Sequence, residues 1–290
     1  MTVINTNVAA TITANALTKN ERAMSQAMER LSTGQRINSA GDDAAGLAIS
    51  SRMTTYITGL DMAVRNANDA ISMIQTADGA LIEMTNMLQR MRELAVQASS
   101  GTYSATDRDA LNVEFEALTA AVEDIADDTQ WNGVSLLNGA SAFSFHVGAN
   151  ASQTISLTIA DFETEESSMT SGIFEALADG VTSNNDNSGD DLDSLDVDTV
   201  SNAGTALTYI TTALGRIESH RATLGATINR LEYAADNLAN VSQNTLASRS
   251  RVLDADYASE TTELARTQII QQAATAMLSQ ANQQAQSVLA

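Results

Sequence analysis

Acidic side chains are the first candidates for chemistry in this sequence. Aspartates recur every two or three positions at Asp191, Asp193, Asp196 and Asp198. Carboxylates at such intervals could bind Ca²⁺, but this stretch lacks the central glycine and the terminal glutamate of an EF-hand loop. A solvated acidic loop explains the pattern better, so we predict no metal site here.

The other titratable candidates also have structural interpretations. Asp42 and Asp43 follow Gly41 and are well placed to cap a helix that begins at Ala44. His146 lies in an alternating, strand-like segment, and His220 lies between apolar helical positions. The chain has no Cys, and neither histidine has a recognisable Ser-His-Asp context, so we predict no enzyme, no cofactor and no disulfide.

Charge is distributed unevenly along the 290 residues, whose formal net charge is −21. Residues 109–214 contain no Lys or Arg but 19 Asp and Glu, whereas the two ends together carry 17 acidic and 15 basic residues. An acidic chain repels phosphate backbones, which argues against nucleic-acid binding. The near-neutral ends are suited to packing on each other, and the acidic middle to facing solvent. We see neither a cleaved signal peptide nor an apolar run long enough to span a membrane.

Apolar spacing predicts two long helices at opposite ends of the chain. The first covers residue 44 to about residue 99, where from Leu60 onward apolar residues recur mostly in alternating steps of three and four, and the second covers 203–238, where the same alternation has no break. The second seam contains one polar member, Arg221. A shorter helix with the same spacing follows an imperfect capping box formed by Ser104 and Asp107. The predicted fold is mainly α, a long antiparallel coiled-coil-like bundle formed by the N- and C-terminal regions.

The middle of the chain has a different residue pattern from the helical ends. Residues 143–147 and 155–159 alternate apolar and polar side chains around a Gly- and Asn-containing turn, which predicts a small β-hairpin. The next stretch is rich in Asn, Asp, Ser and Gly. We predict that residues 166–199 form a short, outward-facing acidic insertion. The acidic segment 163–200 should contribute little to a core and be dispensable for assembly.

The two extreme ends are weakly amphipathic and carry few charges. Alone they should form marginal helices, so we expect them to be disordered in a monomer and helical in an assembly that supplies more apolar surface. The domain prediction is an inner terminal region of 1–43 and 251–290, and a bundle of 44–165 and 200–250. The candidate self-assembly residues are Ile4, Val8, Ile12, Leu31, Leu264, Ile270, Met277 and Val288.

Several strings resemble bacterial flagellins. They are LSTGQRINSAGDDAAGLAI at 31–49, DAISMIQTADGA at 69–80, LQRMRELAVQA at 88–98, DTQWNGVSLL at 128–137, ASRSRVLDADYA at 247–258 and QIIQQAATAMLSQANQQAQSV at 268–288. They occur in the family's order and at its spacing, and the resemblance covers roughly 1–160 and 203–290. It implies a hairpin-shaped subunit of an open helical homopolymer, the extracellular flagellar filament used for swimming.

The resemblance also implies partners. These are a flagellar export chaperone, the filament cap and hook-associated proteins, met during export through the flagellar type III route. The absence of Cys and Pro suits a chain that is exported unfolded. The alternative is a secreted coiled-coil protein, such as a hook–filament junction (hook-associated) protein or an adhesin, which would form finite complexes. The strings at 88–98 and 254–258 favour the filament subunit.

Two further expectations concern the surface. By resemblance, a host flagellin-sensing Toll-like receptor would contact Gln89, Arg90, Leu94 and Glu114, although Leu94 could equally be packed within the bundle. Hydroxyl side chains of the outward-facing region are candidate O-glycosylation sites, namely Thr154, Thr158, Ser167, Ser168, Thr170 and Ser171.

Overall fold

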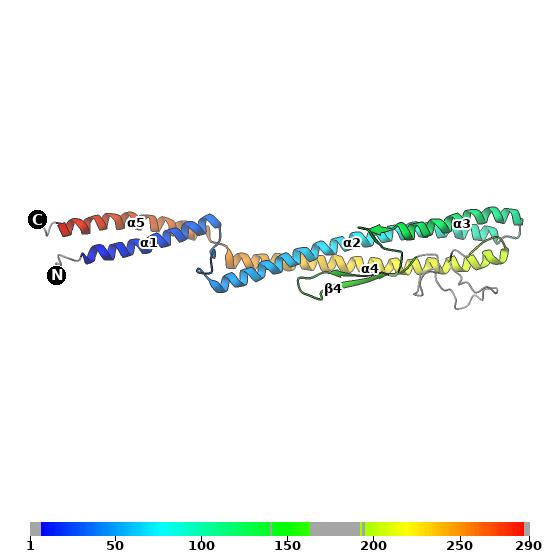
Figure 1. The fold of residues 1–290 in the computed structure, drawn as a ribbon, viewed down its shortest axis with the longest axis horizontal. Helices are drawn as coiled ribbons and strands as arrows, with labels where there is room; N and C mark the ends of the chain where they lie inside the picture. Colours follow the sequence, from blue (N-terminus) through cyan, green and yellow to red (C-terminus); the bar gives the residue numbers. More distant parts are fainter. Residues whose placement is uncertain (1–6, 140, 163–191, 193–194, 287–290) are drawn as a thin grey trace. The chain divides into compact units, whose positions relative to one another are not determined.

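The computed structural model describes residues 7–139, 141–162, 192 and 195–286. Within these ranges the chain forms α1 (Val8–Thr33), α2 (Ala44–Ala98), α3 (Ala105–Asp128), β1 (Gln130–Trp131), β2 (Val134–Ser135), β3 (Ser141–His146), β4 (Thr154–Ile159), α4 (Val200–Leu253) and α5 (Tyr257–Gln286) (Figure 1). The mainly helical fold with a small β-hairpin is confirmed. In the part of the chain that is described, no helix has the length and apolarity needed to cross a bilayer.

The chain divides into two compact units, 1–58 with 242–290 and 59–241, and α2 and α4 contribute to both. In the first unit α1 and α5 lie side by side (Figure 1). The Asn7 side chain caps the start of α1 by accepting a hydrogen bond from the Ala10 N–H at 3.0 Å. Gly34 ends α1 in the left-handed conformation, with φ of 71°.

Backbone hydrogen bonds fasten the segment after α1 to the segment before α5. The Arg36 N–H donates to the Leu253 carbonyl at 2.7 Å, and the Ala255 N–H donates to the Gly34 carbonyl at 2.9 Å. Between Gly34 and α2 the buried Ile37 packs on the first turn of α2 at Gly46, where a Cβ would come within 2.6 Å of its Cδ1 atom. These contacts hold the two chain segments together close to the α1–α5 pair.

Of the two aspartates predicted to cap α2, Asp43 does so, whereas Asp42 bonds within the loop before the helix. The Asp43 carboxylate accepts a hydrogen bond from the Gly46 N–H at 2.9 Å, the geometry of a helix N-cap. Asp42 accepts from the backbone N–H groups of Ser39 and Asn38, and these hydrogen bonds lower the pKa of its carboxyl group. Both side chains therefore have structural partners.

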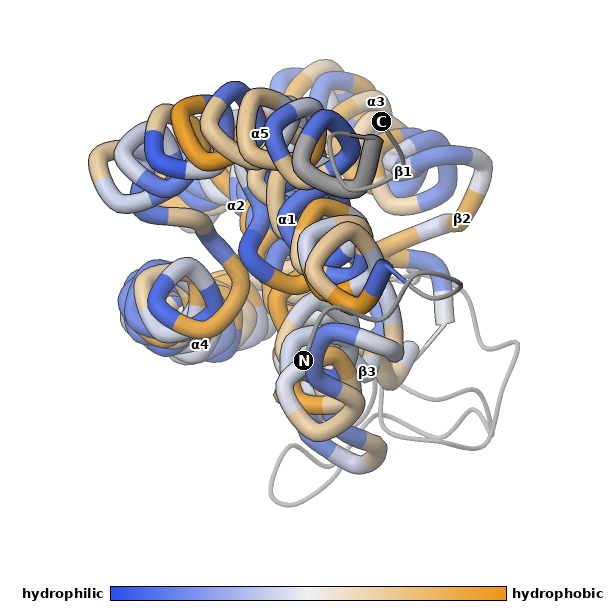
Figure 2. Tube along the Cα trace, turned by 90° about the vertical axis from the view of Figure 1, so that its left-hand side faces the viewer, coloured by the Kyte–Doolittle hydropathy of each residue, from blue (hydrophilic) through white to orange (hydrophobic). Residues whose placement is uncertain are grey.

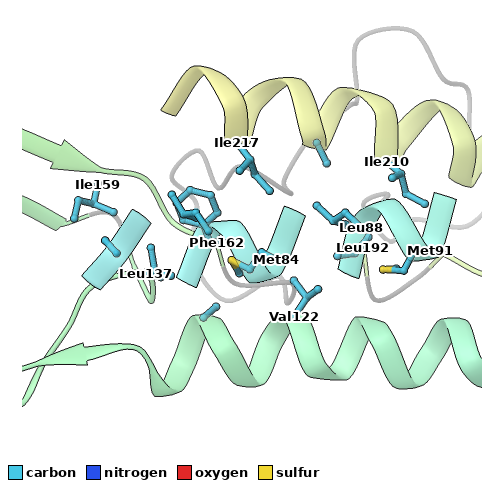
Figure 3. Close-up of a cluster of buried hydrophobic side chains, with 14 of the residues drawn as sticks. Met84, Leu88, Met91, Val122, Leu137, Ile159, Phe162, Leu192, Ile210 and Ile217 are labelled. Carbon is cyan, nitrogen blue, oxygen red and sulfur yellow. The ribbon is translucent and has the colours of Figure 1, made fainter. Parts of the chain in front are cut away.

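The second unit is built around side chains from α2, α3 and α4 (Figure 3). Met84, Leu88 and Met91 of α2 meet Val122 of α3 and Ile210 of α4 in one buried cluster. The predicted seams are thus the faces that pack. Arg221, the polar member of the second seam, donates from Nε to the Asp78 carboxylate at 2.7 Å. This ion pair balances the positive charge of Arg221 within the seam.

Local signals fix the remaining elements of this unit. Ser104 and Asp107 form a complete capping box at the start of α3. β3 and β4 pair antiparallel, with Phe143 opposite Leu157, and the inner face of β4 is buried. A second hairpin, β1–β2, was not predicted. Its turn is Asn132-Gly133, both at positive φ, a common two-residue hairpin connection.

One prediction about the acidic insertion was wrong. Apolar residues near its C-terminal end, Leu192, Leu195 and Val197, are buried in the main hydrophobic cluster. In addition, the Val197 N–H donates to Asn112 Oδ1 of α3 at 2.9 Å. This end of the insertion therefore contributes to the core, because its isolated apolar residues dock onto the helices. Asp191 and Asp193 lie outside the described residues, as does most of 166–199.

Both ends of the chain form helices, α1 and α5, which is the conformation predicted for the assembly. The predicted division at residues 43 and 251 follows helix ends, whereas the compact units divide within α2 and α4. About the first fifteen residues of α2 and the last turns of α4 belong to the same compact unit as the terminal helices, so the units do not coincide with the elements.

Candidate functional site

The terminal pair, defined here as α1 and α5, is held by a narrow contact face. Its buried side chains are Asn20 and Ala27 of α1 and Thr267 of α5. Asn20 donates from Nδ2 to the Thr267 carbonyl at 2.7 Å, a buried hydrogen bond between segments far apart in the sequence. Two of these three buried residues are polar, and the apolar side chains Leu17, Leu31 and Leu264 of these helices are only half-buried, so the apolar burial within the pair is incomplete.

Polar contacts tie the pair together along its length. Near one end, Asn7 donates from Nδ2 to the Ala281 carbonyl at 3.1 Å. Near the other, the Arg30 guanidinium and the Glu260 carboxylate form a 3.1 Å ion pair whose side chains are largely covered. The Arg30 Nε atom is buried and has no hydrogen-bond partner among the described residues. Hydrogen bonds and an ion pair therefore set the register of α1 against α5.

Large apolar side chains remain exposed on other faces of both helices. On α1, Ile12 is 65% exposed, and on α5, Ile269 and Met277 are 67% and 62% exposed. The exposed set on the terminal pair consists of Val8, Ile12 and Met28 of α1 and Tyr257, Ile269, Ile270 and Met277 of α5. Hydrophobic and hydrophilic residues both occur along these helices in Figure 2. These exposed apolar side chains make the terminal pair a candidate contact surface for another molecule.

The predicted self-assembly residues fall into three groups. Val8, Ile12, Ile270 and Met277 belong to the exposed set, whereas Leu31 and Leu264 are half-buried. Ile4 and Val288 lie outside the described residues. Sequence reasoning did not select Ile269 or Tyr257, because a helix with apolar residues on several faces does not show which face its partner covers.

The four candidate receptor residues are placed differently from one another. Arg90 donates from Nε and Nη2 to Glu114 at 2.9 and 2.8 Å, and from Nη1 to Glu93 at 2.9 Å. These hydrogen bonds, first those to Glu114, raise the pKa of Arg90. Gln89 is exposed, but Leu94 is only 1% exposed and packs within the core cluster. The polar members therefore lie on the surface without Leu94 beside them.

Other candidate groups have defined surroundings. Thr154 and Thr158 lie on the exposed face of β4, while Ser167, Ser168, Thr170 and Ser171 lie outside the described residues. Asp196 and Asp198 both accept hydrogen bonds from the Asn202 side chain, and burial raises the pKa of Asp196. Among the described residues no acidic or histidine cluster could hold a metal ion.

The histidines differ in environment. His146 is exposed at the end of β3, and its carbonyl accepts a hydrogen bond from Asn66. The His220 ring meets the Phe162 ring edge to face at a centroid distance of 5.4 Å, and its buried Nε2 atom has no partner among the described residues. Burial lowers the pKa of His220. Neither arrangement provides a nucleophile or a general base with its orienting group.

This architecture defines a class of protein. The ends of the chain pair as helices, and both helices of the pair expose large apolar side chains. Long paired helices with exposed apolar side chains, and no described metal or catalytic cluster, are typical of a structural protein that associates with other molecules.

Comparisons with known proteins identify the family. Residues 4–142 match the bacterial flagellin N-terminal helical region, and residues 207–290 match the bacterial flagellin C-terminal helical region. The flagellin of Bacillus subtilis is 42% identical over 99% of this chain and 98% of its own. The flagellin of Halalkalibacterium halodurans is 45% identical over 91% of this chain and 90% of its own.

The chain therefore belongs to the bacterial flagellin family, structural proteins that polymerise into the extracellular flagellar filament. A solved structure provisionally named as a flagellar hook-associated protein of Vibrio parahaemolyticus has a TM-score of 0.58 and 10% identity, covering 73% of this chain and 100% of its own. At that identity the likeness is one of fold alone. The hook-associated alternative thus has no better support than the filament subunit.

Proposed function

We propose that this filament subunit polymerises through the exposed apolar residues of its terminal pair. The observation that carries the proposal is the exposed set on α1 and α5, beside a contact face whose buried residues are mostly polar. Covering a large apolar side chain contributes about 1.5–3 kcal/mol. Several such residues on each subunit give enough driving force for a long polymer, because every subunit repeats the same contacts.

Folding and association of the terminal pair would be coupled. Ordering each residue costs about 1–2 kcal/mol, and the apolar burial seen between α1 and α5 offsets little of that cost. In an isolated subunit the pair should therefore open often, even though its hydrogen bonds specify which residues meet. In the filament, neighbouring copies supply the missing apolar surface and hold both helices closed.

The remaining proposals follow from membership of the family. The subunit would leave the cell unfolded through the flagellar type III route, and would meet an export chaperone, hook-associated proteins and the filament cap on the way. A host flagellin-sensing receptor would contact the surface formed by Gln89, Arg90 and Glu114. With Leu94 buried, apolar contact there would come from the exposed Val96 on the same helix. Thr154 and Thr158 would be available for O-glycosylation.

Truncation tests the proposed assembly mechanism. Chains lacking residues 1–30 or 265–290 should keep the helical signal of the second unit but should not elongate filament fragments used as seeds. Hydrogen exchange on the intact monomer should be fast in α1 and α5 and slow over residues 74–91 and 207–231. Filaments formed by either truncated chain, or equal protection of the ends and the bundle, would contradict the mechanism.

A further inference from the structure

A groove in the second unit, which we call the Trp131 groove, has an unusual lining. It occupies about 360 Å³ between α2, β1 and β3. Its lining includes Ala70 and Met73 of α2, Trp131 of β1 and Phe145 of β3. Ala70 and Met73 are buried, whereas Trp131 and Phe145 pack against the core cluster but are only half-buried. The groove therefore offers aromatic surface that the chain itself leaves uncovered.

Neighbouring contacts hold the Phe145 ring and the short strand that carries Trp131 in place. Phe145 stacks on Phe143, with ring centroids 6.4 Å apart and planes 8° from parallel. Trp131 pairs with Val134 across the tight β1–β2 turn. At the rim, Asn66 donates from Nδ2 to the His146 carbonyl at 3.2 Å, which joins α2 to the end of β3. The walls are thus formed before any partner arrives, which reduces the ordering cost of binding.

The charge in the groove is negative. Asp69 lies at the rim and is exposed, and no Lys or Arg is present among the described residues that line the groove. A groove lined by both a carboxylate and aromatic rings suits an organic cation, because ring faces and carboxylates both attract positive charge. A guanidinium fits this lining better than an ammonium, since it can stack flat on a ring and bind a carboxylate in its plane.

We propose that the Trp131 groove receives an arginine side chain from a second copy of this chain in the filament. Charge complementarity within the sequence supports this occupant. Of the 15 basic residues, 14 are arginines, and all lie outside the acidic stretch of residues 109–214 that contributes Trp131 and Phe145. A polymer of identical subunits brings these arginines to neighbouring copies at high local concentration. The proposal rests on polymerisation and adds a specific contact to it.

The single tryptophan makes the groove directly observable. Trp131 is the only Trp of the chain, so the emission of the intact protein reports the groove alone. Filaments grown from seeds should show acrylamide quenching of Trp131 reduced about twofold or more relative to the monomer, because a bound side chain excludes the quencher. Quenching that is unchanged on polymerisation would overturn the proposal.

Charge removal tests the arginine. Asp69→Asn should raise the monomer concentration left in equilibrium with filaments about threefold to tenfold, while Asp69→Glu should restore it to within about twofold. Asp109→Asn removes an equally exposed carboxylate from α3 and serves as the matched control, with no expected change. Circular dichroism of each monomer confirms that the variants are folded.

The outcomes separate this proposal from the proposed function. If the wild-type chain forms no filaments, the proposed function fails and the groove contact fails with it. If wild-type filaments form and Asp69→Asn matches the Asp109→Asn control, polymerisation stands and the arginine contact is wrong. If Asp69→Asn and Asp69→Glu weaken assembly equally, shape rather than charge is recognised, and the proposal is again overturned.

Discussion

Leu192 tests the finding that the acidic insertion contributes to the core. Its side chain is 0% exposed and belongs to the cluster formed by α2, α3 and α4 (Figure 3). Leu192→Ala removes most of an isobutyl group, a loss of about 2–3 kcal/mol of transfer free energy. The cavity that remains raises the expected loss in free energy of unfolding to about 2–5 kcal/mol.

The assay is urea unfolding of the full-length protein, followed by circular dichroism and by the emission of Trp131. Val113→Ala serves as the control, because Val113 is an exposed side chain on α3 and its truncation should change stability by less than about 0.5 kcal/mol. Leu192→Ala should lower the urea midpoint without changing the slope of the transition. A midpoint equal to that of the control would refute the core role of this segment.

Three further predictions concern other contacts. Because burial lowers the pKa of His220 in the folded state, the unfolded state binds more protons, so stability should fall as pH drops through about 6.5, and His220→Gln should flatten this dependence in urea titrations. Asp43→Ala should cost about 1 kcal/mol through loss of the α2 cap, measured as a lower urea midpoint, and Asp43→Asn should retain most of that stability. Glu260→Gln should speed hydrogen exchange in α1 and α5 roughly tenfold while leaving α3 unchanged, because Arg30 loses its ion-pair partner at a largely covered site; unchanged exchange would show that the ion pair does not hold the terminal pair.

Helices with a regular seam and a clear cap could be predicted from the sequence. The step of three and four residues along α2, together with Asp43 before Ala44, defines both the face that packs and the start of the helix. The alternation of β4 likewise gave its buried face. In these segments the local pattern and the tertiary contacts agree, so a single sequence was sufficient.

Short and irregular elements could not be predicted in the same way. β1 and β2 have two residues each, too few to show a period. Leu192, Leu195 and Val197 stand singly among polar residues, so only the tertiary structure shows that they enter the core. Their burial depends on contacts with helices distant in sequence, and the local spacing of apolar residues does not predict such contacts.

The candidate site was predicted only in part for a related reason. The apolar residues of α1 and α5 were recognised, but not which of them pair within the chain and which stay exposed. The buried positions include Asn20 and Thr267, which a search for apolar stripes passes over. Leu94 is a second example. The resemblance suggested that its side chain contacts a receptor at the surface, whereas in the structure the side chain is packed in the core.

The most direct test of the account is the assembly of Ile12→Gln. Ile12 is exposed on α1 and distant from the buried contacts of the terminal pair, so the change should leave the monomer intact and remove apolar surface needed by a neighbouring copy. In seeded polymerisation, the monomer concentration in equilibrium with filaments should rise roughly tenfold to thirtyfold, the equivalent of about 1.5–2 kcal/mol. Val113→Gln, an equally exposed change on α3, should have no such effect. An unchanged equilibrium for Ile12→Gln would contradict assembly through the exposed faces of the terminal helices.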